Sequence, residues 1–348
     1  MKKLRFCVAL VSLLFIAGCE SDNIVERQSF VFGTLVEVIV YGASDNRANR
    51  AIDEVMHDFD YLHHKFHPWS KSAGSELVLL NEHIAAGKPF KVSADMALMI
   101  RDMQYYERIT QGFFNTAIGR LVDLWGFHSS HFTPHLPAPG DIKFLISQKP
   151  SAQDLVIDNQ GYVRSSNRFV SLDDGGYAKG LALDRAVGIM KRHHIKNALI
   201  NIGGNVIALG GKGGKGWLIG IRDPHSSRAF AIIQLHDGEA IGTSGDYNRS
   251  FDYKGTRYCH VINPLSGYPP VGVESVTVLI GKGQRAGVES DVMSKPLFLS
   301  PSTEWLRMAR SLGIKFAVRV YRGKYEMTSG LAKRAIFVDP KVSIVDLK

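Results

Sequence analysis

The sequence predicts a fold of the α+β class. Two observations support this: short strand patterns dominate the chain from residue 153 onward, and only a few long helical patterns interrupt them. A strand meander of this kind favours α+β over a doubly wound sheet. Hydrophobic residues make up 45% of the 348-residue chain and charged residues 22%, which is typical of a folded globular protein.

The N-terminus has the pattern of a bacterial lipoprotein signal peptide. A basic start, MKKLR, precedes an apolar run that is short for a transmembrane helix, and Ala17 and Gly18 stand directly before Cys19. We expect a signal peptide over 1–18 and a lipid on Cys19, which places the protein on the periplasmic side of the inner or outer membrane. A plain signal peptide with a chance cysteine is the alternative. We expect residues 19–29 to form a lipidated tether and residues 30–348 a single domain.

Apolar spacing predicts the elements of the first half of the domain. The segment 30–41 alternates apolar, often β-branched, residues with polar ones, as a strand does, and Ser93 is a favourable N-cap. The predicted elements are a strand (30–41), a helix (46–64), a loop with a short helix (66–90), a helix (93–110) and an exposed loop (128–140). The loop holds His128, His131 and His135, which we expect to be solvated rather than bound to a metal.

The second half alternates short strands with three helices. The predicted strands are 153–158, 162–164, 169–172, 198–202, 205–209, 217–221, 229–235, 239–243, 256–262, 274–280, 315–320 and 335–338, and the predicted helices are 176–193, 286–298 and 302–312.

Charge and cysteine content narrow the class of partner. The net charge is +9, and three of the positive charges lie in the leader. A mild basic excess suits an anionic ligand or a surface beside anionic lipid. No Lys/Arg run is interleaved with aromatic residues, so nucleic acid is not an expected partner. Cys259 lies in a strand pattern and is interpreted as a small buried hydrophobe, with a reactive thiol as the alternative.

The glycine turn in SLDDGGYAKGLALDRAVGIM (171–190) is the most informative segment. A strand pattern ends at Leu172, two glycines follow, and a helix begins. Such a turn lets backbone N–H groups approach an anion, and the helix dipole favours negative charge there. Lys179 lies in the first turn, where a cation is disfavoured by the dipole. It therefore faces an anion such as a pyrophosphate, or it is solvated beside Asp173 or Asp174; the residues leave both readings open.

Two further segments carry polar groups at strand ends. Gly203 and Asn205 lie between two strand patterns and are placed to contact a ligand, whereas the 210–216 turn is interpreted as a mobile hairpin. His260 lies in a strand pattern that leads into Asn263, and it is a candidate general base or ligand contact, with a purely structural role in the strand as the alternative.

Taken together, these segments resemble the ApbE family, the FAD:protein FMN transferases. The resemblance covers nearly all of the chain after the leader. It is carried by six ordered blocks, FGT, FHPWSKSAGSELVLLN, GFFNTAIGRLVDLWGF, LDDGGYAKGLALDRA, LINIGGNV and TSGDYNRSF…YCHVINPLSGYP. It implies an ApbE-like α+β fold related to the tunnelling fold, with duplicated β-α-β units.

The resemblance also implies an activity. A protein of this family binds FAD as its substrate, transfers the FMN half to a Thr or Ser hydroxyl of a target protein and releases AMP. The implied targets are subunits of membrane redox complexes such as the sodium-pumping NADH:quinone reductase and Rnf. The implied metal is Mg²⁺, which neutralises charge on the diphosphate.

Site residues follow from the same resemblance. His260 and Asp291 would be catalytic, with His260 as the base. The residues implied to contact FAD are Phe32, Trp69, Phe113, Phe114, Asn115, Asp173, Lys179 and His260. The implied metal ligands are the Gly176 carbonyl and the Asp291 carboxylate.

The chain departs from the family pattern at two positions. The family has a threonine ligand four residues after the aspartate, where this chain has Lys295, and a charged lysine cannot ligate Mg²⁺. Ser294, one position earlier, is a substitute oxygen donor. Asp174 stands where the family has an apolar residue. We expect Lys295 to pair with Asp174 or to point at the pyrophosphate and partly replace the metal, and Pro296 to bend its helix.

Two alternatives to transfer stay open. Water in place of the target hydroxyl would make the protein an FAD hydrolase that yields FMN and AMP. A non-enzymatic FAD-binding lipoprotein is the second alternative, and Lys295 favours it.

Overall fold

The computed structural model describes residues 23–68, 74–128, 135–247, 249–338 and 342–347. Cys19 and Trp69 lie outside the described residues. A nine-stranded sheet forms the centre of the molecule, and all but one of its strand pairs are antiparallel. In spatial order its strands are β1 (Ile24–Val31), β2 (Thr34–Tyr41), β6 (Asn197–Ile202), β7 (Asn205–Leu209), β10 (Ala240–Gly245), β13 (Val273–Ile280), β14 (Phe316–Tyr321), β15 (Lys324–Thr328) and β17 (Val342–Val345).

Three smaller sheets and the helices surround this sheet. The smaller sheets are β16 (Ala335–Phe337), β9 (Ala229–Leu235) and β8 (Trp217–Arg222); β11 (Ser250–Tyr253) and β12 (Thr256–Cys259); and β3 (Phe90–Lys91), β5 (Tyr162–Ser165) and β4 (Leu155–Ile157). The helices are α1 (Asp45–Phe66), α2 (Glu76–Ala86), α3 (Ala94–Ile109), α4 (Gly119–Leu124), α5 (Pro139–Ser147), α6 (Ala178–Arg192), α7 (Ala286–Leu299), α8 (Trp305–Ser311) and α9 (Ser329–Ala332), with a 3₁₀ turn over Ala152–Asp154.

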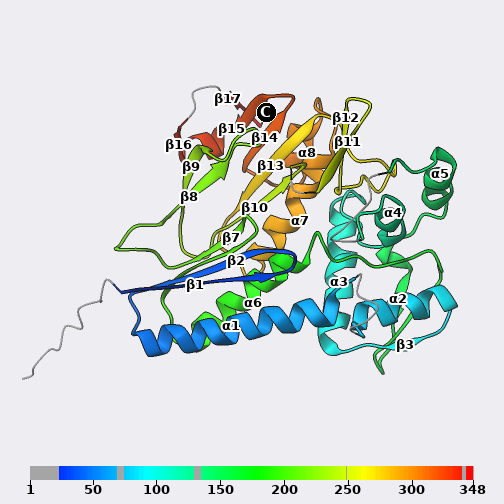
Figure 1. Ribbon diagram of the computed structural model, residues 1–348, viewed down its shortest axis with the longest axis horizontal. Coiled ribbons are helices and arrows are strands. Elements are labelled where there is room, and N and C mark those ends of the chain that lie inside the picture. The colour runs from blue at the N-terminus through cyan, green and yellow to red at the C-terminus, as the bar shows by residue number, and fades with distance from the viewer. Residues whose placement is uncertain (1–22, 69–73, 129–134, 248, 339–341, 348) are drawn as a thin grey trace, which may run out of the picture.

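The molecule is layered around the large sheet (Figure 1). Helices α1, α6 and α7 cover one face and form the main core with it, while β8, β9 and β16 pack a second core on the other face. A third cluster centres on Trp125, which packs α4 and α5 against the β11–β12 hairpin. These layers confirm the predicted α+β class.

Two parts of the chain share one pattern. Strand β2 leads into helices that return to its antiparallel neighbour β6, and β13 leads into α7 and α8, which return to its antiparallel neighbour β14. Each part therefore places a helix against the sheet beside its own strands. Within the described residues, no helix is both long and apolar enough to cross a bilayer.

The structure corrects two expectations about the N-terminal region. The segment 30–41 is not one strand: it holds the end of β1, a hairpin turn and β2, because Phe32 and Gly33 have φ values of 56° and 68° and reverse the chain. Residues 24–29, expected in the tether, belong to β1, so the folded domain begins before residue 30. The polar side chains of this edge strand account for the error: Arg27, for instance, pairs with Asp53 and Asn49 of α1.

Two other local predictions differ from the structure. The expected strand 169–172 is reduced to a single bridge between Ser171 and Ile118. The last two residues of the expected loop 128–140 belong to α5, which begins at Pro139, a favourable residue for a first helical turn. The expected helix 286–298 is confirmed as α7, which includes Pro296 and ends at Leu299.

Candidate functional site

A cavity of ≈ 440 Å³ lies where the β1–β2 turn, the end of α1 and the start of α6 meet. A cavity of this size is ordinary for a small-molecule site. Its lining residues are Phe30, Val31, Phe32, Gly33, Leu62, His63, Phe66, His67, Pro68, His128, Asp174, Gly175, Ala178, Lys179 and Arg249. Two of the residues predicted to bind FAD, Phe32 and Lys179, are therefore on its wall.

Phe32 forms the aromatic part of the wall. The positive φ of Phe32 and Gly33 in the hairpin turn holds the Phe32 side chain against α1. Its ring centre lies 5.9 Å from that of Phe59 and 5.8 Å from that of His63, both in edge-to-face contact. An aromatic ring held in this way is ready to stack on a planar ligand.

The segment 113–115 lies behind the glycine turn rather than in the cavity. The ring of Phe114 is buried, and a Cβ added to Gly176 would meet it at 3.5 Å. The side-chain amide of Asn115 holds its own loop, donating to the Pro150 carbonyl at 2.9 Å and accepting from the Ala117 amide at 2.8 Å. None of the three described residues Phe113, Phe114 and Asn115 lines the cavity.

Asp173 organises the glycine turn. One carboxylate oxygen accepts the Gly175 amide at 2.9 Å, and the other contacts His128 Nε2 at 3.0 Å. The expectation that His128 is solvated is therefore wrong, because the fold brings its ring to an aspartate 45 residues away. The carbonyl of Asp174 accepts the Tyr177 and Ala178 amides at the start of α6.

Asp174 and Lys179 carry the charge at the helix start. Asp174 is buried, and burial, with the neighbouring Asp173, raises the pKa of its carboxyl well above the ordinary value. Lys179 lines the cavity and is close enough to oppose this shift in the pKa of Asp174. Within the described part of the chain, the Lys179 ammonium makes no side-chain hydrogen bond or ion pair, which favours the reading that it faces a ligand.

His260, the predicted base, lies directly after β12. Its Nδ1 contacts the Arg249 carbonyl at 3.2 Å. Burial and the positive charge of Lys179 lower the pKa of His260 to about 4. The imidazole is therefore neutral at physiological pH and has an unprotonated nitrogen with which to accept a proton.

Asp291 reaches the start of α6 because α6 and α7 cross at two glycines. A Cβ on Gly180 would lie 2.6 Å from the Gly287 carbonyl oxygen, and a Cβ on Gly287 would lie 2.6 Å from the Gly180 carbonyl oxygen. This close crossing lets Asp291 Oδ2 accept the Gly180 amide at 3.1 Å. In a regular helix that amide would bond to the carbonyl of Gly176.

Lys295 pairs with Asp291 rather than with Asp174, so the expected Asp174 pairing is wrong. Its Nζ bonds to Asp291 Oδ1 and donates to the Asp291 carbonyl at 2.7 Å. The two residues are one helical turn apart on α7, a spacing that brings side chains together. Asp174 belongs to another segment and faces the cavity.

The oxygen donors available to a metal do not fit Mg²⁺ in this chain. Asp291 has both carboxylate oxygens engaged, by the Gly180 amide and by Lys295. The Ser294 hydroxyl is buried, lies 2.7 Å from the Ser244 hydroxyl and donates to the Asp291 carbonyl at 2.8 Å. Among the described residues, no group of three or more His, Cys, Asp or Glu side chains could hold a metal ion.

The sequence-based prediction assigned no role to three ionisable residues of the cavity wall, His63, His67 and Arg249. His63 and His67 line it with ring centres 4.7 Å apart, and burial lowers the pKa of both. Their spacing of four residues places them on one face at the end of α1, which was the available signal. Arg249 lies in the resemblance block TSGDYNRSF and had no role assigned to it.

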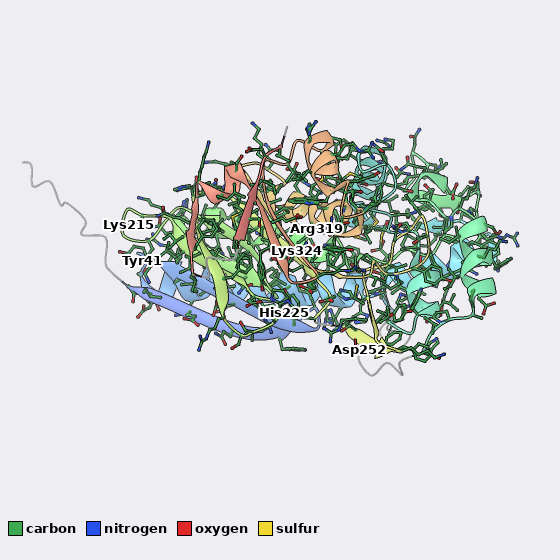
Figure 2. The ribbon with its side chains drawn as sticks, turned by 90° about the horizontal axis from the view of Figure 1, so that it is seen from above. Tyr41, Lys215, His225, Asp252, Arg319 and Lys324 are labelled. Atoms are coloured by element: carbon green, nitrogen blue, oxygen red, sulfur yellow. The ribbon has the colours of Figure 1, made fainter. Side chains whose placement is uncertain are left out.

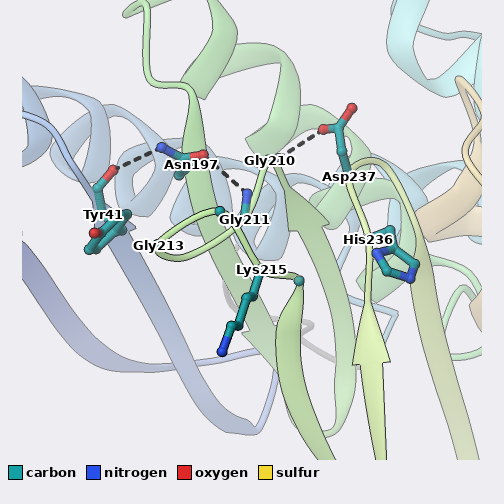
Figure 3. A pocket seen from close by; sticks show the side chains of 10 residues that line it. Tyr41, Asn197, Gly210, Gly211, Gly213, Lys215, His236 and Asp237 are labelled. Carbon is teal, nitrogen blue, oxygen red and sulfur yellow. Dashed lines mark hydrogen bonds between the residues drawn. The ribbon is translucent and has the colours of Figure 1, made fainter. Parts of the chain in front are cut away.

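A second cavity, of ≈ 330 Å³, lies beside the 210–216 hairpin (Figure 3). Two of its polar side chains accept hydrogen bonds from backbone amides of this hairpin. Asn197 accepts the Gly211 amide at 3.1 Å, and Asp237 accepts the Gly210 amide at 2.8 Å. Tyr41 and Lys215 of this cavity lie toward the opposite end of the molecule from Asp252 in the β11–β12 hairpin (Figure 2). None of the predicted site residues lines it.

Comparison with known proteins identifies the family. The ApbE family model matches residues 32–318. A FAD:protein FMN transferase from Rhodobacter capsulatus is 35% identical over 85% of this chain, and the chain spans 55% of that relative's length. The transferase of the same name from Klebsiella pneumoniae is 30% identical over 74% of this chain and 78% of its own.

Solved structures agree with this assignment. The ApbE protein of Thermotoga maritima is 27% identical and superposes with a TM-score of 0.80 over 90% of this chain and 99% of its own. The flavinyl transferase ApbE of Pseudomonas stutzeri is 24% identical and has the same fold, with a TM-score of 0.77 over 90% of this chain and 97% of its own. The chain belongs to the ApbE family.

Proposed function

We propose that this protein is an FAD:protein FMN transferase. One observation carries the proposal: the aromatic ring of Phe32 and the cations Lys179 and Arg249 line one cavity at the N-terminus of α6. A flavin dinucleotide combines flat rings with a diphosphate, so it matches a wall with both characters. The names of the curated relatives support the same activity.

The proposed reaction exchanges one phosphorus–oxygen bond for another. The hydroxyl oxygen of a Thr or Ser on the target forms a bond to the phosphorus of the FMN half. The bond from that phosphorus to the bridging oxygen breaks, and AMP leaves with this oxygen. The hydroxyl proton passes to His260. Reactions of this type depend on positioning and charge stabilisation more than on covalent assistance from the protein.

The charges around His260 suit this order of events. Burial and the charge of Lys179 lower the pKa of His260 in the protein without FAD, so the imidazole is neutral before FAD binds. The negative diphosphate, once bound, offsets the charge of Lys179 and raises the pKa of His260 toward its ordinary value of 6.5. A base whose pKa lies closer to the working pH transfers protons more efficiently.

The substrates beyond FAD are also proposals. The chemistry of the reaction calls for a target with an accessible hydroxyl, and subunits of membrane redox complexes such as the sodium-pumping NADH:quinone reductase and Rnf are the implied class. The leader pattern before Cys19 supports a lipid anchor on the periplasmic side of the inner or outer membrane. Membrane fractionation of a Cys19→Ser variant tests the anchor, since the variant should appear in the soluble fraction.

Mass spectrometry of FAD mixed with the protein and a Thr-containing target domain tests the activity. Transfer predicts a target whose mass is increased by FMN, together with AMP in equal amount. AMP and free FMN without the adduct would indicate FAD hydrolysis, and intact bound FAD would indicate a binding protein; either result would overturn the proposal. A target domain with its acceptor Thr changed to Val is the control and should gain no mass.

A further inference from the structure

The position where the resemblance implies a metal ion is filled by a side chain of the protein. Lys295 reaches back one turn of α7, and its ammonium bonds to both the carboxylate and the carbonyl of Asp291. A Cβ added to Gly176 would lie 3.3 Å from Lys295 Cε, so the end of the lysine also rests against the glycine turn. The two residues implied as metal ligands, Gly176 and Asp291, therefore both adjoin the end of the Lys295 side chain.

Burial makes this arrangement hard to exchange for a metal. The side chains of Asp291 and Lys295 are 1% and 14% exposed. An uncompensated charge in such a place is strongly unfavourable, so the carboxylate needs one cation beside it. Mg²⁺ would have to displace the ammonium, which has no other carboxylate partner within the described residues, and the two cations would repel each other.

The pair lies beside the cavity. The end of Lys295 rests against Gly176, which directly follows Gly175 of the cavity wall. Asp291 accepts the amide of Gly180, which directly follows Lys179 of the same wall. Lys295 therefore contributes its positive charge to the same region as Lys179.

We propose that Lys295 is the resident cation of this site, and that flavin transfer by this protein needs no divalent metal. The inference rests on the proposed transferase function and adds the identity of its cation. In this role Lys295 holds the Asp291 side chain against the start of α6, and its charge complements the diphosphate of FAD. The transfer step is the bond exchange described above.

The first experiment uses the unmodified protein. FAD affinity, followed by the quenching of flavin fluorescence, is measured in excess EDTA and in saturating MgCl₂, together with the melting temperature under both conditions. We expect the Kd to change by less than about threefold and the melting temperature to stay constant, because no metal binds. A gain in affinity of about tenfold or more with Mg²⁺, or a melting temperature that rises with it, would overturn the inference.

The second experiment creates a metal response. Lys295→Thr removes the ammonium and supplies a hydroxyl oxygen at the same position of α7. We expect this variant to melt at a lower temperature in EDTA than the unmodified protein and to be stabilised again by Mg²⁺, because Asp291 then lacks a cation. Lys282→Thr is the matched control. Its ammonium is paired with Asp237 on the surface, and we expect no response to Mg²⁺.

These outcomes separate the two proposals. If FAD binds and is transferred only in the presence of Mg²⁺, the lysine inference is wrong and the transferase function stands. If FAD binds under neither condition, the transferase proposal fails first. If Lys295→Thr does not fold, the EDTA and MgCl₂ comparison on the unmodified protein still decides the question.

Discussion

The close crossing of α6 and α7 makes Gly180→Ala the most direct test of how the site is built. The added methyl group would lie 2.6 Å from both the Gly287 carbonyl oxygen and the Val288 Cα, whereas ordinary contacts begin at 3.4 Å. The helices must therefore separate by about 0.8 Å, since both obstacles are backbone atoms that cannot rotate away. Overpacking of this kind costs roughly 1–3 kcal/mol and sometimes more.

The magnitude follows from two opposing terms. Alanine in a helix interior is more favourable than glycine by about 1 kcal/mol, and for Gly180, in the first turn of α6, at most this amount offsets the overpacking. Because the contact involves backbone on both sides, we take the upper part of the range and expect a net loss of roughly 2 kcal/mol in the free energy of unfolding. Separation by that distance would also stretch the 3.1 Å bond between the Gly180 amide and Asp291 beyond hydrogen-bonding range.

Gly188→Ala on the same helix is the control. There the new methyl group would meet only the end of the Arg192 side chain, at 3.9 Å. We expect it to stabilise the protein by about 0.5–1 kcal/mol. Urea denaturation measures both variants, and flavin fluorescence measures the affinity for FAD, which should fall only for Gly180→Ala. If Gly180→Ala proves as stable as Gly188→Ala, the packing argument is refuted.

Two further predictions concern partly buried ionisable groups. The pKa of His260 is lowered to about 4 in the folded protein, from an ordinary 6.5. As the pH falls from about 6.5 to about 4, the imidazole therefore takes up a proton in the unfolded chain but not in the folded protein. The free energy of unfolding should fall by about 3 kcal/mol over this pH range. His260→Asn should remove this part of the loss, as urea midpoints near pH 7 and near pH 4 will show; an unchanged pH dependence would contradict the assignment. Asp184 accepts the Gly287 and Val288 amides at 2.8 and 3.0 Å, so Asp184→Ala should cost roughly 2–3 kcal/mol. Asp184→Asn keeps one acceptor and should cost less, and equal losses in urea denaturation would show that these bonds contribute little.

Local patterns predicted most of the elements correctly. Periodic apolar residues placed α1, α3, α6 and α7, and alternation placed β6 to β10 within a few residues. The errors fall where the local signal is weak. Strand β1 was expected to be a tether because an edge strand pairs on one side only and tolerates polar side chains. The short helix α4 and the strands β15 and β17 were not predicted, since each is only four to six residues long.

The candidate site was partly predictable for a similar reason. The glycine turn, Lys179 and His260 belong to sequence blocks that could be recognised one at a time. His63 and His67 were missed because their role depends on where the end of α1 lies against the β1–β2 turn. The ring of His128 was assigned to solvent because nothing in its own loop indicates the contact with Asp173.

The sequence by itself determined the α+β class, the main helices, the glycine turn and the family resemblance, since each depends on neighbouring residues or on an ordered set of blocks. The tertiary structure decided which charges meet. Lys295 was expected to lie near Asp174 or a ligand, and the fold places it on Asp291. The physical reason is that α6 and α7 cross closely at Gly180 and Gly287, which brings the Asp291 carboxylate to the Gly180 amide. Lys295, one turn further along α7, then lies beside this carboxylate and pairs with it.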